Sequence, residues 1–440
     1  MTPKSKKPTQ ASSPSPSPSS SSSSSPASSS SSSSSSVSLL SVIVALVALS
    51  VSGFAFVAPQ QWELVKHHTQ TRVLQLLDQY QGISPAPREL DCSTATQYLT
   101  EVGPVKGFHV ICTKKSAEDV LSITAYKDGM APALTTESPA EFAAFKAELE
   151  RLFEISPPTD ELAIKYKQPY AFFTPEGKRL ERLGDIANRV VFLFEGGQFI
   201  WPGIKIGHKT IVRNVTGKGD LVLETLSMIP LVFSVEEFLK DEEIDVILDL
   251  SLEHLKPSGV THMDGHEDRP ATEWRTSTTY FLSSKRHELV QQIDRRTEDL
   301  VKVPMAHMED VQVLRYEETQ KYDQHTDYFP PEHHRNSPEV LKMIEHGYKN
   351  RMITVFWYMS DVARGGHTIF PRAGGKPMPS STKDCSKGLK VPPQKRKVIV
   401  FYSMLPNGES DPMSLHGGCP VEEGIKYSGN KWVWNKPVSF

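Results

Sequence analysis

The chain has 440 residues, a formal net charge of −3 and an isoelectric point near 6.6. This balance excludes the global positive field that holds nucleic acid, so we expect no nucleic-acid partner. Hydrophobic residues make up 38% of the chain, which is enough for ordinary packed cores, and the length suggests two or three domains.

The N-terminal region divides into two segments of different composition. Residues 1–36 are almost entirely serine, with proline, alanine and a few lysines. Such a segment has almost nothing to bury, so we expect a disordered tail. Residues 37–58 carry no charge and are mostly Val, Leu, Ala, Ile or Phe. A helix of this length, at about 1.5 Å per residue, is long enough to span a bilayer core.

Three interpretations of residues 37–58 stay open. An uncleaved signal anchor would fix the chain in the membrane of the endoplasmic reticulum or Golgi, with the C-terminal half in the lumen. A cleaved signal peptide, with a possible site around Gly53 to Ala55, would give a secreted protein. The stretch from Ala55 to Pro59 also resembles the Phe-containing cleavage motif of plastid-targeting presequences in algae with secondary plastids.

A polar stem is expected at residues 59–90, and residues 91–220 have the pattern of a small α+β domain. Apolar residues at helical spacing predict a helix from Glu141 to Phe153, and the buried run from Val190 to Phe194 predicts a strand. We assign no chemical motif to this domain. Its sequon at Asn214 could carry a glycan only if the domain is lumenal.

The pattern changes at Val232, and we expect the second domain to begin near residue 221. A helix is predicted from Val235 to Leu255, and short strand-like runs follow, separated by Gly, Pro and Asn. Many short strands with such punctuation are typical of a jelly-roll sandwich or barrel. The predicted strands are Val311–Tyr316, Met352–Met359, Lys397–Ser403 and Lys431–Asn435.

The four cysteines do not form a C-x-x-C motif, so a zinc ribbon or a thioredoxin-type site has no support. Two cysteines fall in each half of the folded region. In an oxidising compartment the natural pairs are Cys92 with Cys112 and Cys385 with Cys419. The alternative is four unpaired, mostly buried thiols.

The pattern His-x-Asp begins at three positions, His262, His266 and His325. The first two triplets lie in a run of Gly, Asp, Glu and Pro, so we expect them in loops. The third follows the strand predicted at 311–316. Positions i and i+2 of an extended strand face the same way, so His325 and Asp327 can present an imidazole and a carboxylate to one metal ion.

Near the C-terminus, His416 lies between a strand and a glycine turn, and Lys426 follows on the next predicted strand. Two histidines and one carboxylate on one face of a metal, with its other positions open, are the ligands of non-haem iron(II) oxygenases. The open positions are needed because 2-oxoglutarate and O₂ must both bind the iron. A lysine in an apolar pocket supplies a charge for the distal carboxylate of 2-oxoglutarate, and a phenol can add a hydrogen bond.

In order and spacing these motifs resemble the prolyl 4-hydroxylases of the collagen, plant and algal type. The resemblance covers about half the chain, from roughly Met228 to Lys436. The segments that carry it are Arg275-Thr276-Ser277 with Phe281-Leu282, then Tyr316, Lys321 to Phe329, Gly365 to Thr368 with Phe370-Pro371, Asp411 to Val421, and Gly424, Lys426 and Asn430-Lys431-Trp432.

The resemblance implies a role for the matching polar positions. His325, Asp327 and His416 would bind Fe(II). Lys426 and Tyr316 would bind the distal carboxylate of 2-oxoglutarate. A lysine ten residues after the distal histidine is informative, because many other 2-oxoglutarate oxygenases have an arginine there.

Other matching positions bear on the peptide substrate. Tyr322 and Trp432 match peptide-contacting positions of the family, and Arg275 lies in the segment near the substrate entrance. The chain departs from the family where His367 replaces the usual Glu and where Tyr427 replaces a common Trp. Neither is a ligand position, so both departures bear on substrate handling.

The stretch from Pro330 to Lys349 is longer than is usual in the family and contains His333 and His334. We expect this pair to lie in an exposed loop rather than to form a second metal site. A loop that covers the site would tune the choice of substrate.

Together these features imply an α+β protein. Residues 221–440 would form a double-stranded β-helix, or jelly-roll, oxygenase domain with flanking helices, after the small α+β domain at 91–220. The reaction would be 4-hydroxylation of proline in a proline-rich polypeptide, with Fe(II), 2-oxoglutarate, O₂ and ascorbate. The alternatives are the same chemistry on another acceptor and a non-catalytic binding module. The oligomeric state is not predicted.

Overall fold

The computed structural model describes residues 92–438, except residues 158, 160 and 166–169. The expected tail at 1–36, the apolar segment at 37–58 and the stem at 59–90 lie outside the described residues. Within the described part of the chain, no helix is both long and apolar enough to cross a bilayer. All the elements below lie in one compact unit, which runs from Ala86 to Phe440.

The first sheet has six antiparallel strands in the order β3-β2-β1-β6-β4-β5. Strand β6 is buried along its whole length, with Phe192 and Phe194 in one apolar cluster and Val191 and Leu193 in another. Both faces of this sheet are therefore covered, which explains an uninterrupted apolar run in one strand. The strands are β1 (Phe108–Lys115), β2 (Val120–Tyr126), β3 (Leu134–Pro139), β4 (Ala171–Phe173), β5 (Arg179–Leu180) and β6 (Val190–Phe194).

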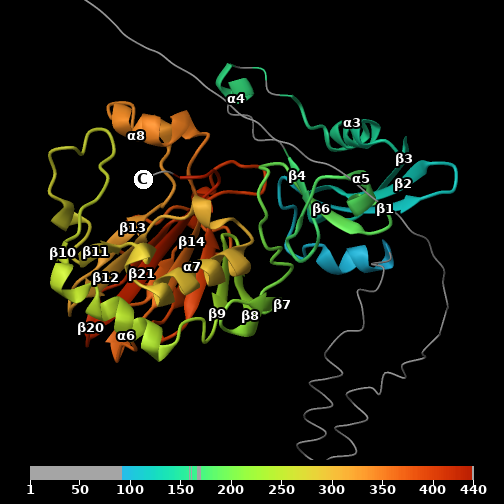
Figure 1. Cartoon of the computed structure of the whole chain (residues 1–440). Coiled ribbons are helices and arrows are strands. Elements are labelled where there is room, and N and C mark those ends of the chain that lie inside the picture. The colour runs from blue at the N-terminus through green and yellow to red at the C-terminus, as the bar shows by residue number, and fades with distance from the viewer. Residues whose placement is uncertain (1–91, 158, 160, 166–169, 439–440) are drawn as a thin grey trace, which may run out of the picture. The chain divides into compact units, whose positions relative to one another are not determined.

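Helix α3 (Phe142–Phe153) covers one face of the six-stranded sheet (Figure 1). Its buried residues Phe145, Leu149 and Phe153 form a stripe at four-residue spacing. The helix ends where Glu154 adopts the left-handed conformation. The helix and the strand predicted for this region are confirmed, and the shorter helices are α4 (Glu161–Lys165) and α5 (Leu183–Ile186).

The second sheet has nine antiparallel strands in the order β10-β11-β12-β21-β14-β18-β9-β8-β7. The domain boundary expected near residue 221 falls inside β8, because β7 already pairs with β8 in this sheet. The strands are β7 (Lys209–Val215), β8 (Gly219–Met228), β9 (Leu231–Val235), β10 (Lys256–Pro257), β11 (Thr278–Leu282), β12 (Val311–Tyr316), β14 (Arg351–Tyr358), β18 (Val398–Tyr402) and β21 (Lys426–Trp434).

A smaller sheet faces part of the large one. Its four strands have the order β13-β19-β16-β17. Strands β15 and β20 form a separate two-stranded sheet; along the chain β15 precedes β16, and β20 follows β19. Leu314, Phe356 and Phe401 of the large sheet share an apolar cluster with Phe370 and Val391 of the small sheet. The strands are β13 (Tyr322–His325), β15 (Arg364–Gly365), β16 (Thr368–Phe370), β17 (Leu389–Val391), β19 (His416–Gly418) and β20 (Val421–Glu423).

Helices α6 (Asp241–Asp249) and α7 (Glu288–Val301) contribute to the other main cluster of the large sheet, and α7 crosses its central strands (Figure 1). A fully buried ion pair joins the two helices, with Arg296 Nη2 2.6 Å from Glu243 Oε1. A second buried pair, Asp294 Oδ1 to Lys431 Nζ at 2.6 Å, fixes α7 to β21. Breaking a buried pair leaves an uncompensated charge, so these contacts set the position of α7 strongly.

The predicted helix from Val235 to Leu255 is wrong in extent. Val235 is the last residue of β9, and α6 begins only at Asp241. Phe238 and Leu239 supplied part of the helical spacing, but they belong to the connection and are buried in the same cluster as the helix. The apolar pattern therefore predicted correctly that Phe238 and Leu239 are buried, but it predicted their backbone conformation incorrectly.

The four predicted strands are confirmed with small shifts at their ends. The strand at 311–316 has the predicted bounds, and those predicted at 352–359 and 397–403 correspond to β14 and β18. The predicted strand at 431–435 is the end of β21, which begins five residues earlier at Lys426. Polar residues at the start of β21 hid its true length.

All four cysteines form disulfides, in the pairs expected for an oxidising compartment. Cys92 is bonded to Cys112, which ties a 3₁₀ turn to β1. Cys385 is bonded to Cys419, which ties the connection between β16 and β17 to the residue after β19. The second bridge therefore lies close in sequence to His416.

Candidate metal centre

Two strands of the small sheet bring the three expected metal ligands together. Strands β13 and β19 pair antiparallel in a register that places His325 opposite His416. Asp327 is the second residue after the end of β13. The local alternation of β13 thus supplies one histidine and the carboxylate, and the pairing of the sheet supplies the second histidine.

The donor atoms of the three side chains converge. One atom from each of His325, Asp327 and His416 lies within 4.8 Å of the others. Asp327 Oδ1 is 3.9 Å from His325 Nε2, and Asp327 Oδ2 is 3.6 Å from His416 Nε2. Within the described ranges this is the one cluster of three such groups that could hold a metal ion. Two imidazoles and one carboxylate fit Fe(II) with open positions for smaller ligands.

The other polar atoms of the triad have fixed partners. His325 Nδ1 donates to the carbonyl of Asp323 at 2.8 Å, and His416 Nδ1 donates to the carbonyl of Ser414 at 2.9 Å. A carbonyl can only accept, so each Nδ1 carries the proton and each Nε2 has a free lone pair. The hydroxyl of Thr354 donates to Asp327 Oδ2 at 2.6 Å, which orients the carboxylate.

The protonation states of His325 and Asp327 favour the binding of a cation. Burial, reinforced by the neighbouring His416, lowers the pKa of His325 to about 3. Burial raises the pKa of Asp327, but its electrostatic interactions with the two imidazoles and with Arg351, together with the hydrogen bond from Thr354, outweigh burial, so the pKa lies below its ordinary value. At neutral pH the imidazole of His325 is therefore neutral and the carboxylate is charged, which is the protonation state that metal binding requires.

An aromatic and cationic stack covers one side of the triad. The ring of Tyr322 stacks on the His325 imidazole with a centroid distance of 3.7 Å, and the Arg275 guanidinium lies 4.5 Å from the centre of the Tyr322 ring. Arg275 is held by hydrogen bonds to Ser277 and Gln312. Burial raises the pKa of Tyr322 to about 12, so its hydroxyl stays protonated and can donate a hydrogen bond.

Lys426 lies in an apolar pocket on β21. It is paired in register with Tyr316 of β12, and its side chain is only 2% exposed. Its ammonium lies 5.2 to 5.7 Å from the ring centres of Tyr316, Phe356 and Tyr358. Within the described residues it has neither an ion pair nor a hydrogen bond, and burial lowers its pKa to about 7. A buried cation without a counter-ion is suited to an anionic ligand.

A second cationic group, which the sequence did not single out, lies over Trp432. The Arg351 guanidinium is 3.4 Å from the centre of the Trp432 ring and forms a two-point ion pair with Glu309. The indole nitrogen of Trp432 is buried and has no hydrogen-bond partner among the described residues. Arg351 and Glu309 could have been found only through their contacts, because neither forms part of a recognisable motif.

The remaining expected residues take other positions. The triplets at His262 and His266 lie in a loop, where Asp264 accepts hydrogen bonds from the backbone of Arg335 and Asn336. Asp264 thus joins this loop to the segment that contains His333. The carbonyl of His367 accepts a hydrogen bond from the backbone of Cys419, so this residue lies beside the second disulfide.

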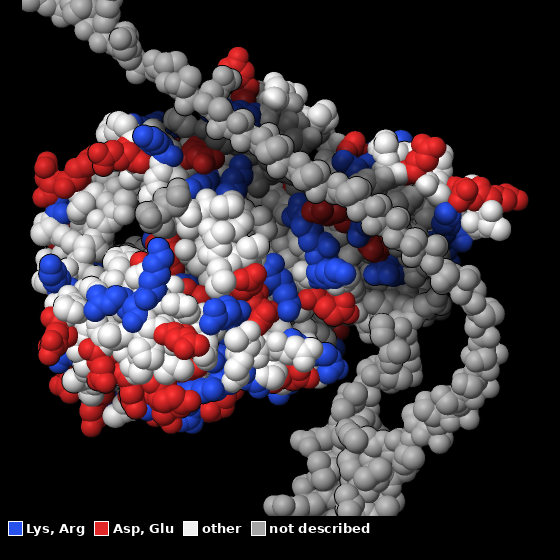
Figure 2. All heavy atoms as spheres, in the orientation of Figure 1, with Lys and Arg blue, Asp and Glu red and all other residues white. Residues whose placement is uncertain are grey.

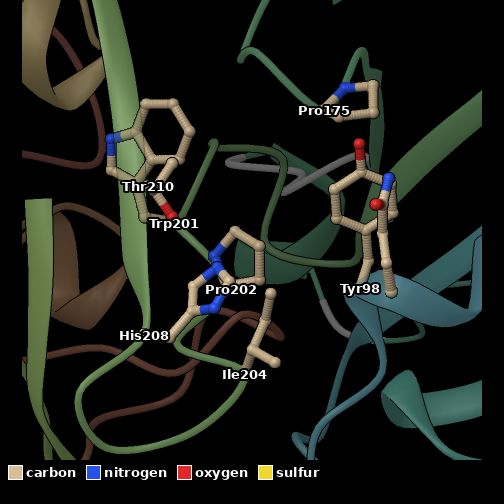
Figure 3. A pocket seen from close by; sticks show the side chains of 8 residues that line it. Tyr98, Pro175, Trp201, Pro202, Ile204, His208 and Thr210 are labelled. Atoms are coloured by element: carbon tan, nitrogen blue, oxygen red, sulfur yellow. The ribbon is translucent and has the colours of Figure 1, made fainter. Parts of the chain in front are cut away.

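Two cavities lie apart from the metal-binding strands. The smaller has a volume of about 200 Å³ and is lined by Tyr98, Trp201 and Pro202, among others (Figure 3). The larger has a volume of about 330 Å³, shares Trp201 and Pro202, and reaches Asp411. Neither cavity is lined by the triad or by Lys426.

Comparison with known proteins identifies relatives of the C-terminal half. A sequence model of the 2OG-Fe(II) oxygenase superfamily matches residues 311–434. Probable prolyl 4-hydroxylase 3 of Arabidopsis thaliana is 36% identical over 221 residues, which are 49% of this chain and 73% of the relative. Prolyl 4-hydroxylase 2 of the same plant is 36% identical over 218 residues, 48% of this chain and 69% of the relative.

Solved structures also match this half. The viral collagen prolyl hydroxylase from Paramecium Bursaria Chlorella virus-1, in its 2OG complex, is 22% identical, with a TM-score of 0.33. That match covers 46% of this chain and 95% of the viral chain. A Pseudomonas putida prolyl-4-hydroxylase is 16% identical, with a TM-score of 0.30, and covers 46% of this chain and 91% of that chain.

The hydroxyl of Thr354 provides a test of the triad that does not depend on turnover. We expect Thr354→Val to weaken binding of Fe(II), or of Mn(II) as a stable substitute, by about 10- to 100-fold, because an unheld ligand carboxylate loses its orientation. Metal affinity would be measured by calorimetric titration. Thr297→Val removes a buried hydroxyl on α7 and is the matched control, with unchanged affinity expected. Equal affinities in all three proteins would contradict the role of Thr354.

Proposed function

Because this chain belongs to the prolyl 4-hydroxylase family of 2OG-Fe(II) oxygenases, we propose that it hydroxylates proline residues of polypeptides at C4. 2-Oxoglutarate would be the co-substrate, with succinate and CO₂ as its products. The relatives named prolyl 4-hydroxylases support proline as the acceptor. They match the C-terminal half, so the proposal concerns that half of the chain.

The observation that carries this proposal is the triad of His325, Asp327 and His416, of which Asp327 and His416 are buried, in the same molecule as an unpaired, buried Lys426. The triad would bind the metal, and the lysine would bind an anionic ligand. A binding module that had merely kept the fold would have no physical reason to retain a buried, uncompensated cation, which is costly without a ligand.

The strand order supports a jelly-roll for the oxygenase domain. Successive strands alternate between the two sheets, with β12 in the large sheet, β13 in the small one and β14 in the large one again. After β16 and β17 in the small sheet, β18, β19 and β21 continue the alternation. Two interlocked four-strand sets, β12-β21-β14-β18 and β13-β19-β16-β17, are the arrangement that such a fold requires.

In this proposal each site residue has a separate task. His325, Asp327 and His416 hold Fe(II), and Lys426 pairs with the distal carboxylate of 2-oxoglutarate, with the Tyr316 hydroxyl as a second donor. Bound Fe(II) and 2-oxoglutarate supply, together with O₂, the oxidant that replaces a C4 hydrogen of proline by a hydroxyl. Ascorbate would keep the iron reduced. The apolar rings around Lys426 exclude water and so strengthen its ion pair.

The polypeptide would be held beside the triad by Tyr322, Trp432 and Arg275. Tyr322 already covers the His325 ring and keeps its phenolic proton. The buried indole N–H of Trp432 lacks an acceptor among the described residues, and a substrate carbonyl would satisfy it. Proline lacks a backbone N–H, so recognition through substrate carbonyls suits a proline-rich chain.

The reaction is tested with the purified full-length chain, Fe(II), ascorbate, 2-oxoglutarate and a panel of proline-rich peptides. We expect succinate release coupled to a gain of one oxygen in mass on proline. His416→Ala should lose at least about 100-fold in turnover, because a metal with one ligand fewer is held weakly. His266→Ala, in a His-x-Asp triplet outside the site, should retain full activity.

Other outcomes would separate the alternatives. Release of succinate without modification of the peptide would indicate that the enzyme hydroxylates another acceptor. Absence of succinate from a protein with verified metal would favour the binding module and refute the proposed function. Activity retained in His416→Ala would refute the assignment of the triad.

The low pKa of Lys426 predicts that 2-oxoglutarate binding takes up a proton. The free lysine has a pKa of about 7 and is partly neutral above this value, whereas the bound carboxylate requires the ammonium form. The affinity should therefore decrease as the pH rises from about 7 to 9. Calorimetry in buffers of different ionisation enthalpy should show an uptake near one proton at pH 8, and none in Lys426→Met. Proton uptake unchanged in the variant would contradict this assignment.

We also propose that the catalytic half acts in the lumen of the endoplasmic reticulum or Golgi, with residues 37–58 as the membrane anchor. The two disulfides support an oxidising compartment. The measurement is protease protection of the full-length protein in intact microsomes. Digestion of the C-terminal half without detergent would exclude a lumenal location.

A further inference from the structure

One surface segment has an unusual charge. The basic loop, defined here as residues 372–390, connects β16 to β17 and includes the first two residues of β17. It has five basic residues and one acidic residue, a net charge of +4 in a chain whose net charge is −3. The rest of the chain therefore carries −7, and the positive charge is concentrated in one place.

The lysines of the basic loop form no ion pairs with the described residues, although Asp384 lies in the same loop. Lys376, Lys383, Lys387 and Lys390 are all exposed, and none has an ion-pair partner among the described residues. Many cations outside the loop are paired, and Figure 2 shows acidic and basic side chains interspersed over the visible face. Examples of pairs outside the loop are Lys106–Glu409, Lys115–Asp119, Lys205–Glu101 and Lys209–Glu224.

The basic loop is attached to the strand that carries the first two metal ligands. The backbone N–H of Gln324 donates to the carbonyl of Thr382 at 2.9 Å, and its side-chain amide donates to the carbonyl of Asp384 at 2.6 Å. Gln324 immediately precedes His325. Lys383 therefore lies between two residues that are hydrogen-bonded to the neighbour of a metal ligand.

The loop is also attached to the strand that carries the third ligand. Cys385 is bonded to Cys419, three residues after His416. In the small sheet, Lys390 pairs with Ile369, and Ile369 pairs with Gly417. Two strand spacings separate Lys390 from Gly417, a distance of about 10 Å between backbones. Lys390 is thus held near the metal centre by the sheet, and Lys383 by the two hydrogen bonds to Gln324.

We propose that the basic loop is a docking surface for acidic residues that flank the target proline, so that the preferred substrate is an acidic, proline-containing peptide. This inference rests on the proposed function for its reaction, and it adds the charge of the substrate. A loop that only increased solubility would not need two hydrogen bonds and a disulfide to the metal-binding strands. Four unpaired cations in a short segment repel one another, and an acidic peptide would relieve that repulsion.

The expected effect is on selectivity. Two exposed ion pairs with the loop would favour an acidic peptide over a neutral one by roughly fivefold. The preference for the acidic peptide should weaken as salt is added, because exposed charges more than about 10 Å apart are largely screened at 0.1 M ionic strength. Complementary charge also increases the rate of encounter more than it slows release.

The test compares three peptides with one central proline, flanked by Asp and Glu, by Asn and Gln, or by Lys. Binding to the metal-loaded full-length protein is measured by fluorescence anisotropy, and KM and kcat are measured for the same peptides. The acidic peptide should bind about fivefold more tightly than the neutral one at low salt. The variant K376Q/K383Q/K387Q/K390Q should lose most of this preference through KM, with kcat little changed.

The matched control is K106Q/K115Q/K205Q/K209Q, which removes the same charge from four ion-paired lysines outside the loop. It should keep the preference of the native protein. Equal affinity for all three peptides, or an equal loss in both variants, would overturn the proposal. Charge-dependent binding without hydroxylation would leave the docking surface standing and refute the proposed reaction, because anisotropy does not depend on turnover.

Discussion

His325 and His416 face each other because β13 and β19 pair in one register, and the rest of the site is arranged around that pairing. A slip of one residue would turn the side chains of one strand to the opposite face of the sheet. The register is supported by close backbone contact. A Cβ added at Gly417 would lie 3.0 Å from the carbonyl oxygen of Tyr322, a tight contact that a small shift of the neighbouring backbone would have to relieve.

The charges of the site follow from the same arrangement. The sheet takes His325, Asp327 and Lys426 out of water, and each then adopts the protonation state that burial and its neighbours favour. Asp327 remains ionised because cationic and polar groups surround it. The Lys426 ammonium lies near three aromatic rings and has no ion-pair partner among the described residues, so its charge is available for a ligand. The triad thus carries a negative charge among polar groups, whereas the Lys426 pocket offers a positive charge among apolar side chains.

Much of this site could be predicted from the sequence, because its essential residues lie in short motifs on strongly patterned strands. The third His-x-Asp triplet was separated from the other two by the strand before it. Thr354 and Arg351 could not be found in this way, because their roles depend on pairing between β14 and strands distant in sequence. The charge of the basic loop is visible in the sequence, but its attachment to Gln324 appears only in the folded chain.

The fold shows the same limit. Apolar periodicity located β6, β12 and α3 well, since each is buried in a simple stripe or run. It failed between Val235 and Asp241, where coil residues are buried as deeply as helical ones. Burial can be inferred from composition, whereas the backbone of a buried connection depends on hydrogen bonds that the pattern does not encode.

The apolar cluster that contains Phe192 and Phe194 of the six-stranded sheet also contains Val400 and Val433 of the large sheet. The two sheets therefore share one interior rather than meeting at a wet interface. A chain cut near residue 221 would separate β8 from β7 and expose aromatic surface on both fragments. The apolar interior of the oxygenase half is thus continuous with that of residues 92–220, and removing those residues would expose part of it to water.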